Sequence, residues 1–496
     1  MRLAVLFLTL AFLHRPAEAR TANAPQPGAY AGYNLIVLSL GNVGTGHMSL
    51  FGYARKTTPR LDRWGADALV FDNAFSPASW TLPVAASWLT GLYPFSHRIL
   101  NRVSENLLPP GIRTLPELLR SRGYRTAAFT GGLDYYRDFS TMRGFSETDS
   151  NPNFTGFGTT LAQAQAWLAR RPRGPFMLFV HGYDAHCPFT PPPDLLGTFS
   201  DPKRTGITVD SSRCVRGAWR PEKGDFQANY TMLWSTAPVA RVPEPVHLTQ
   251  ADIDFLGELY DEEVLSVDAQ LGSFLASLDR KLREKTIVVV FSEHGEMFAK
   301  HGRFGRAGAT RGTLYDDVIH VPLAIRVPGL KGRRIPALVE LTDLAPTLAS
   351  WLGVAIPYAP QGKDLSPLLR GAGRIHDHIF AGLPFLWPRN PERPESVNDS
   401  VRNREWKLIR EIRWSTSRWR RWLGRPPKTT LELYRIAADP EERRNVAPEN
   451  PEVVEGLLRE LDAWRTACGR FLPRAPGTRP VPAQLLEDAK NHGYWP

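Results

Sequence analysis

Short, continuous apolar runs that alternate with helical patterns constrain the fold of this chain more than any other feature. The runs are Leu35–Leu40, Thr126–Phe129, Phe176–Val180, Thr286–Phe291 and Val321–Val327. Such runs suit strands that are buried on both faces. Helical patterns lie between them, at Leu115–Ser121 and from about Gln250 to Leu278. The alternation predicts an α/β fold in which a mostly parallel central sheet is sandwiched by helices.

The N-terminus has the composition of a secretory signal. Arg2 is followed by an apolar stretch from Leu3 to Leu13 and by small residues up to Ala19, so we expect export to the periplasm or the extracellular space. An uncleaved membrane anchor is the alternative, although the stretch is shorter than the ~20 residues that span a bilayer. The expected segments are a signal peptide (1–19), a leader (20–33), a catalytic-fold domain (34–370) with an insertion near the pocket (188–245), a smaller C-terminal subdomain (371–470) and a tail (471–496).

The cysteines and the charge restrict the classes of protein that fit. Cys187, Cys214 and Cys468 form no Cys-x-x-Cys pair, which argues against a zinc cluster, while Cys187 and Cys214 could pair after export. The formal net charge of +11 favours anionic partners such as a glycan, a lipid headgroup or a phosphate ester. No nucleic-acid motif appears, so we expect no nucleic-acid partner.

Polar residues follow several of the apolar runs, and the carboxyl ends of parallel strands are where ligands gather. Gly41-Asn42 follows the first run, and Glu293-His294 follows the fourth. Thr81 stands just before Pro83 and a helical pattern, which puts it at a helix N-terminus where free backbone N–H groups favour an anion. Helix capping alone would also explain Thr81.

Ordered blocks along most of the chain resemble the sulfatase family of the alkaline phosphatase superfamily. The blocks begin at Leu38-Ser-Leu-Gly-Asn42, Trp80-Thr-Leu-Pro83, His181-Gly-Tyr-Asp-Ala-His186, Phe291-Ser-Glu-His-Gly-Glu296, Thr342-Asp-Leu-Ala-Pro346 and Glu432-Leu-Tyr434. The resemblance implies one divalent cation, calcium, manganese or zinc by subgroup, beside a nucleophile that attacks a sulfate or phosphate ester. Such a cation holds the nucleophile deprotonated and neutralises the ester oxygens.

The resemblance places the nucleophile at Thr81 and the metal ligands at Asn42, Glu293 and His294. Gly41 stands where the family has its first carboxylate ligand, and Ala85 and Gly131 stand where many members have Arg and Lys. Because Thr cannot be oxidised to formylglycine, none is expected, and a phosphate ester is at least as plausible a substrate as a sulfate ester.

Further polar residues match family positions. His181 and His186 are candidates for acid–base catalysis, with Asp184 as a substrate contact; the alternative is a structural turn in which Asp184 caps backbone N–H groups. Arg303 and His301 could face the ester's anionic oxygens, or belong to a solvated basic loop.

Lys407 matches a family position that sometimes reaches the active site. It lies in a Trp-rich, basic stretch, Arg402–Lys428, that suits stacking on sugars with ion pairing, contact with a membrane surface, or simple packing of a subdomain. Two functions therefore stay open. One is an exported hydrolase or transferase acting on a sulfated or phosphorylated molecule, and the other is a catalytically inactive sulfatase-like protein that binds anionic glycans or lipid headgroups.

Overall fold

An eight-stranded sheet forms the centre of the protein in this computed structural model, which describes residues 25–102, 106–151, 155–170, 172–218, 227–231, 244–305, 313–387, 390–415 and 426–469. The strand order is β12-β2-β11-β9-β1-β5-β3-β4. The strands are β1 (Asn34–Ser39), β2 (Leu69–Phe75), β3 (Arg125–Gly131), β4 (Glu147–Asn151), β5 (Phe176–His181), β9 (Thr286–Phe291), β11 (Leu323–Arg326) and β12 (Arg333–Glu340). β11 is antiparallel to β2 and β9, and the other pairs are parallel. The predicted mostly parallel sheet is confirmed.

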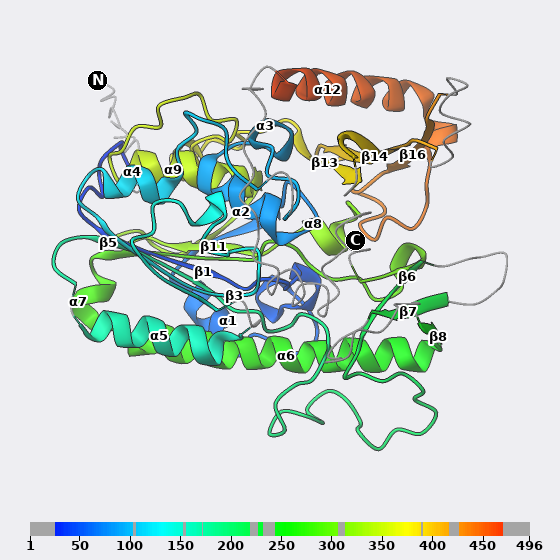
Figure 1. Ribbon diagram of the computed structural model, residues 1–496, viewed down its shortest axis with the longest axis horizontal. Coiled ribbons are helices and arrows are strands. Elements are labelled where there is room, and N and C mark those ends of the chain that lie inside the picture. The colour runs from blue at the N-terminus through cyan, green and yellow to red at the C-terminus, as the bar shows by residue number, and fades with distance from the viewer. Residues whose placement is uncertain are drawn as a thin grey trace, which may run out of the picture.

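Helices cover both faces of this sheet (Figure 1). One face carries α2 (Thr81–Thr90), α4 (Leu115–Arg120), α9 (Leu344–Trp351) and α10 (Ser366–Leu369), and the other carries α1 (Pro59–Gly65), α5 (Phe157–Ala169), α6 (Gln250–Ser277) and α7 (Arg280–Arg283). Successive residues of β1 alternate between the two cores, with Leu35 and Val37 in one and Ile36 and Leu38 in the other. A strand buried on both faces needs apolar side chains at every position, which is why the runs were visible in the sequence.

The two predicted helices are confirmed, and their first residues explain where they start. Thr114 caps α4 and Thr249 caps α6, each in a reciprocal pair with an acidic residue three positions on. Such capping boxes satisfy backbone N–H groups that have no partner inside the helix.

A second sheet comes from the predicted insertion, with the order β10-β6-β7-β8. Its strands are β6 (Cys214–Ala218), β7 (Gln227–Thr231), β8 (Glu244–His247) and β10 (Arg303–Phe304). No strands had been identified in this segment from the sequence. In the structure, β6 pairs with β10, which belongs to the loop after Glu293 and His294. The insertion is thereby tied to the end of the central sheet where the predicted site residues lie.

The C-terminal part forms a four-stranded antiparallel sheet covered by one long helix (Figure 1). Its elements are β13 (Ile379–Trp387), β14 (Asn390–Arg402), β15 (Lys407–Arg413), β16 (Lys428–Tyr434) and α12 (Pro451–Gly469), and the short helices α3 (Pro94–His97) and α8 (Asp316–Ile319) lie between it and the central sheet. Leu457 and Leu461 of α12 pack on Val401 and Leu408 of the sheet. The predicted signal peptide, Trp419, Trp422 and the tail lie outside the described residues. Within the described ranges, no helix is both long enough and apolar enough to cross a membrane.

Candidate active site

The turn after β1 brings Gly41 against the loop that follows β9. The backbone N–H groups of Glu293 and His294 both donate to the Gly41 carbonyl oxygen, at 3.2 and 3.4 Å. Gly41 has a φ of +72°, and a Cβ atom added there would lie 3.0 Å from the Gly182 carbonyl oxygen. Only glycine adopts this backbone conformation without strain. The position that lacks the expected carboxylate is therefore one where the local backbone disfavours any side chain.

The Asn42 side chain is held in one orientation by two acceptors. Its Nδ2 donates to Glu296 Oε2 at 2.8 Å and to the Ala185 carbonyl oxygen at 3.1 Å. A carboxylate and a carbonyl accept but do not donate, so the amide cannot be reversed. Oδ1 consequently points away from both, and it is buried with no hydrogen-bond partner in the described part of the chain. This oxygen is available to a ligand or a cation.

Glu293 presents a second buried oxygen. Its Oε1 accepts a hydrogen bond from the Tyr135 hydroxyl at 2.6 Å, whereas Oε2 has no hydrogen-bond partner among the described residues. Burial raises the pKa of Glu293 to about 7, although the hydroxyls of Ser39 and Tyr135 act in the opposite direction. A carboxylate in this environment gains from a nearby positive charge.

Thr81 meets His294 at the start of α2. The distance from Thr81 Oγ1 to His294 Nε2 is 3.3 Å, and His294 Nδ1 lies 3.1 Å from the Gly295 carbonyl oxygen. If Nδ1 donates to that carbonyl, Nε2 carries the lone pair that faces the hydroxyl. Trp80 is the N-cap, and the Thr81 side chain makes no capping hydrogen bond. Capping therefore does not account for Thr81 in this structure.

His181 occupies space beside Gly41. It is the last residue of β5, its Nδ1 lies 2.8 Å from the Gly131 carbonyl oxygen, and its Nε2 would lie 3.4 Å from a Cβ atom on Gly41. Burial lowers the pKa of His181 to about 4, with the Gly131 carbonyl acting in the opposite direction. The imidazole is thus neutral near pH 7, and its Nε2 can accept a proton or bind a cation.

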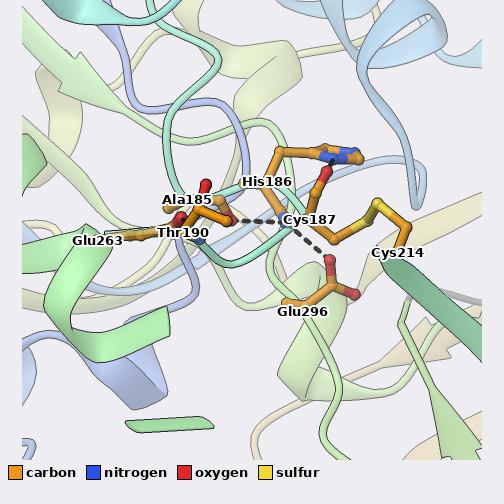
Figure 2. The surroundings of a disulfide bond; sticks show 8 residues. Ala185, His186, Cys187, Thr190, Cys214, Glu263 and Glu296 are labelled. Atoms are coloured by element: carbon orange, nitrogen blue, oxygen red, sulfur yellow. Dashed lines mark hydrogen bonds between the residues drawn. A yellow bond between two sulfur atoms is a disulfide. The ribbon is translucent and has the colours of Figure 1, made fainter. Parts of the chain in front are cut away.

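His186 lies beside a disulfide bond between Cys187 and Cys214, which confirms that these two cysteines can pair (Figure 2). The His186 ring stacks on the Tyr183 ring, and its Nδ1 lies 3.0 Å from the Cys187 carbonyl oxygen. Since Cys214 is the first residue of β6, the disulfide fastens the insertion to the loop that carries His186 and Ala185.

Asp184 has a structural role in this geometry. Its Oδ2 accepts a hydrogen bond from the Phe157 backbone N–H at 2.6 Å, at the start of α5, and its Oδ1 accepts one from Gln270 at 3.3 Å. These contacts correspond to the capping alternative, and they leave the predicted contact of Asp184 with substrate without support.

Arg303, His301 and Lys407 lie toward the C-terminal sheet. Arg303 lines a small cavity together with Glu411 and Glu432 of that sheet, and His301 stacks on Tyr315 with the ring centres 3.7 Å apart. The Lys407 ammonium group is fully buried, 2.7 Å from Asp316 and 2.6 Å from Glu442. An ammonium group enclosed by two carboxylates offers no charge to an ester, so the expected contact of Lys407 with substrate is not what the geometry shows.

The surroundings of Gly131 and Ala85 explain why two expected basic groups are missing. A Cβ atom on Gly131 would lie 1.8 Å from the Thr155 carbonyl oxygen, so no lysine fits there. Ala85 is fully buried in the apolar core under α2, where an unpaired guanidinium would be costly. A different cation lies nearby. Arg102 is buried, pairs with Asp134 through two contacts of 2.7 Å, and stacks over the Trp80 ring, next to Thr81 in the chain.

Three donor atoms in this region have the chemistry of ligands for a divalent cation. Asn42 Oδ1 and Glu293 Oε2 are buried without hydrogen-bond partners in the described ranges, and His294 Nε2 lies 3.3 Å from the Thr81 hydroxyl, which a cation could also bind. Oxygen and imidazole donors together suit manganese or zinc better than calcium, which prefers oxygen alone. The residues therefore fit a cation, but with one carboxylate instead of several.

Sequence reasoning missed the residues that hold these donors. Tyr135 and Ala185 carried no recognisable pattern, and Glu296 was visible only as the end of the Phe291–Glu296 block. Each acts through a contact between segments more than 100 residues apart. No local pattern could have identified them.

The chain matches two known family models and several known proteins. A family model described as Sulfatase matches residues 33–354, and one described as N-sulphoglucosamine sulphohydrolase, C-terminal, matches residues 309–467. The chain is 23% identical over 446 residues to the Delta 4,5-hexuronate-2-O-sulfatase of Bacteroides thetaiotaomicron, with 84% of this chain and 85% of that protein covered. It is 23% identical over 476 residues to arylsulfatase K of Gallus gallus, with 88% and 83% covered.

Solved structures share the fold. The phosphonate monoester hydrolase of Agrobacterium radiobacter aligns with a TM-score of 0.67 and 20% identity, covering 90% of this chain and 100% of that chain. A structure in complex with its substrate D-glucosamine-2-N,6-O-disulfate aligns with a TM-score of 0.67 and 19% identity, covering 89% and 99%.

Proposed function

The chain belongs to the sulfatase family, whose model covers more than half of it, and we propose that it is an exported hydrolase of phosphoric or sulfuric monoesters with Thr81 as the nucleophile. One observation carries this proposal: Thr81 Oγ1 lies 3.3 Å from His294 Nε2 at the N-terminus of α2. A hydroxyl beside an imidazole lone pair is the arrangement that nucleophilic catalysis needs. The free N–H groups of the helix face the same place, and they favour the anionic part of an ester.

The reaction starts with transfer of the Thr81 proton to His294 Nε2. Thr81 Oγ1 then attacks the phosphorus or sulfur atom, and the bond from that atom to the ester oxygen breaks as the new bond forms. The ester oxygen leaves as an alcohol with the proton that His294 took from Thr81. In the second step, neutral His181, beside Gly41, is the candidate to accept a proton from water. The water oxygen attacks the phosphorus or sulfur atom, the bond from that atom to Thr81 Oγ1 breaks, and Thr81 Oγ1 takes up the proton as the inorganic anion leaves.

Asn42 Oδ1, Glu293 Oε2 and His294 Nε2 are the atoms that would hold a divalent cation. When bound, such a cation supplies positive charge that favours the deprotonated nucleophile and stabilises the ester oxygens. One lone pair of His294 cannot both take the Thr81 proton and bind a cation. Proton acceptance and coordination are therefore alternative roles of His294, and a measurement of metal content separates them.

Among the two ester classes, the residues favour phosphate. A threonine that carries sulfate lacks the exit that formylglycine provides, because Thr81 has no second oxygen on Cβ through which sulfate could be expelled. A phosphothreonine instead breaks down when water attacks phosphorus. A relative described as a Delta 4,5-hexuronate-2-O-sulfatase supports an anionic sugar ester as the class of natural substrate. Export through residues 1–19 and the division between residues 34–370 and 371–470 are part of this proposal.

The test is turnover by the purified mature chain of 4-nitrophenyl phosphate, a 4-nitrophenyl phosphonate monoester and 4-nitrocatechol sulfate, with and without Mn²⁺, Zn²⁺ or Ca²⁺. Thr81→Ala is expected to remove activity. Thr90→Ala is the matched control, because it makes the same change at the far end of α2, about 14 Å away along the helix. Phosphate on Thr81, trapped by acid quench and located by mass spectrometry, would identify the nucleophile.

The second candidate function is a catalytically inactive protein that binds anionic molecules. It is favoured by the absence of side-chain groups at Gly41 and Gly131 and by the burial of Ala85. Undetectable turnover of all three esters, together with no bound metal after equilibration with each cation, would reject the first function. The second additionally requires that the protein bind an anionic glycan or lipid headgroup more tightly than a basic control protein does.

A further inference from the structure

A cavity of about 340 Å³ lies at the opposite end of the central sheet from Thr81 and Glu293. Its walls come from α1, the C-terminal part of α6, α7, β9 and β11. Val288 of β9 lines it, whereas Glu293 follows the other end of the same strand. Arg326, the last residue of antiparallel β11, also lines the cavity and lies opposite Val288 in the register of the two strands. In Figure 1, α7 lies at the left of the molecule, whereas α8, which contacts the loop after β9, lies at the right.

Positive charge gathers in this cavity. The lining includes four arginines and one acidic residue, Asp67; the arginines are Arg60, Arg63, Arg283 and Arg326. No ion pair joins any of the four to a carboxylate of the described residues, although many other arginines of the chain are paired. Arg60, Arg63 and Arg283 are exposed and Arg326 is half-buried, so solvent screens their charges from one another, whereas an anion inside the cavity would be attracted by all four.

One wall of the cavity is shaped to hold Arg60. Gly272 lies in the interior of α6, a helix of 28 residues, where glycine is less favourable than alanine. A Cβ atom on Gly272 would lie 2.5 Å from Cδ and 2.6 Å from Cβ of Arg60. The glycine therefore makes room for the Arg60 side chain, and Ser273 Oγ accepts a hydrogen bond from its Nη1 at 2.7 Å. The guanidinium is positioned by a neutral hydroxyl and forms no ion pair among the described residues, although the Asp268 carboxylate, which accepts the Arg60 backbone N–H at 2.9 Å, interacts with its charge.

The remaining lining is apolar and includes an indole. Trp64, Leu275, Leu278 and Val288 face the same space as the guanidinium groups. Guanidinium groups bind sulfate, phosphate and carboxylate oxygens in pairs, and an aromatic face packs against the C–H face of a sugar ring. The volume lies in the range of sites that bind small ligands.

We propose that this cavity is a second, non-catalytic binding site for a sulfated saccharide unit. It would hold one part of a polyanionic chain while another part reaches Thr81, or retain the protein on such a chain. The choice of a sugar rests on the proposed function, in which the chain acts on anionic sugar esters; the anionic character of the ligand rests on the four arginines alone.

The experiment uses the mature chain carrying Thr81→Ala, so that binding is measured without turnover and independently of whether the enzyme is active. A trisulfated heparin disaccharide is titrated by calorimetry, with the unsulfated disaccharide and inorganic sulfate as separate probes. We expect saturable binding of the sulfated disaccharide that weakens at least tenfold in Arg63→Gln/Arg326→Gln. Arg120→Gln/Arg122→Gln, which removes two exposed charges at the end of α4, is the matched control and should change affinity less than twofold.

Gly272→Ala supplies a second variant that keeps every charge. It is expected to displace Arg60, including its Cβ atom, and to weaken binding severalfold at a temperature where the melting curve shows the variant to be folded. Equal losses in the two double variants would reduce the effect to net charge and overturn the proposal. So would inorganic sulfate or the unsulfated disaccharide binding as tightly as the sulfated one, or a Gly272→Ala variant with unchanged affinity.

Discussion

Placing a side chain at position 41 tests the structural account of the missing carboxylate. Gly41 has a φ of +72°, and a Cβ atom there would lie 3.0 Å from the Gly182 carbonyl oxygen. The left-handed conformation costs a non-glycine residue roughly 1–2 kcal/mol, and the close contact adds to that cost. In metal-free buffer, Gly41→Ala should therefore lower the free energy of unfolding by about 1–2 kcal/mol.

Gly41→Asp separates backbone strain from cation binding. Without a cation, this variant should be at least as destabilised as Gly41→Ala, because its carboxylate would be buried near the Gly182 carbonyl oxygen and neutral His181, with no positive charge to replace the water that it has lost. With a cation, ligand binding stabilises the folded state by RT ln(1 + [L]/Kd), which is about 2.7 kcal/mol when the cation is at 100 times its Kd. We expect this stabilisation to be larger in Gly41→Asp than in the unchanged chain.

The assay is urea unfolding of the three proteins in EDTA and in Mn²⁺ or Zn²⁺. The alanine variant measures strain, and the difference between the aspartate and alanine variants measures the carboxylate. The strain argument fails if Gly41→Ala is as stable as the unchanged chain. The placement of a cation beside this turn fails if Gly41→Asp gains no more stability from either cation than Gly41→Ala does.

Three other perturbations have expected outcomes. Glu296→Leu removes the acceptor to which the Asn42 amide donates, so we expect cation affinity to fall by about 10–100-fold in a calorimetric titration, and an unchanged affinity would contradict the orientation assigned to Asn42. Burial raises the pKa of Glu340 from 4.5 to about 7; because the folded state then holds the proton more tightly, this group's contribution to stability is complete below pH 4.5 and is lost as the pH rises to about 7. The free energy of unfolding of Glu340→Gln should depend less on pH between pH 4.5 and about 7. A pH profile parallel to that of the unchanged chain would contradict the raised pKa of Glu340. Replacing Cys187 and Cys214 with Ser opens a loop of 27 residues and should lower the free energy of unfolding by up to about 3–4 kcal/mol, to be measured by urea unfolding beside a Cys468→Ser control.

Much of the fold could be predicted because it depends on local patterns. β1 and β9 have apolar side chains at every position because both of their faces are buried, so continuous runs marked them. Thr114 and Thr249 marked the starts of two helices through their own hydrogen bonds. The order of the motif blocks identified the family, and it assigned Thr81, at a helix N-terminus, and Glu293 and His294, after a strand, to one site before any contact was known.

The direction of β11 was not predictable in the same way. Its apolar run fits a parallel strand as well as the antiparallel one that the structure contains, because burial on both faces requires the same side chains in either direction. The strands of the insertion were also missed, since their pairing with β10 joins segments about 85 residues apart in the chain.

Tertiary contacts decided which side chains of the candidate site are available to a ligand. Sequence alone showed that Gly41 has no carboxylate, but packing showed that the Gly182 carbonyl and His181 already fill that space. The contacts of Asp184, Arg303 and Lys407 were likewise set by other segments of the chain. Asp184 caps α5, Arg303 lines a cavity beside the C-terminal sheet, and Lys407 is enclosed by two carboxylates. The physical reason is that a side chain's charge and hydrogen bonds belong to its surroundings. Those surroundings are assembled from segments that lie far apart in the sequence. Strand and helix patterns, in contrast, depend on consecutive residues and can be recognised in the sequence alone.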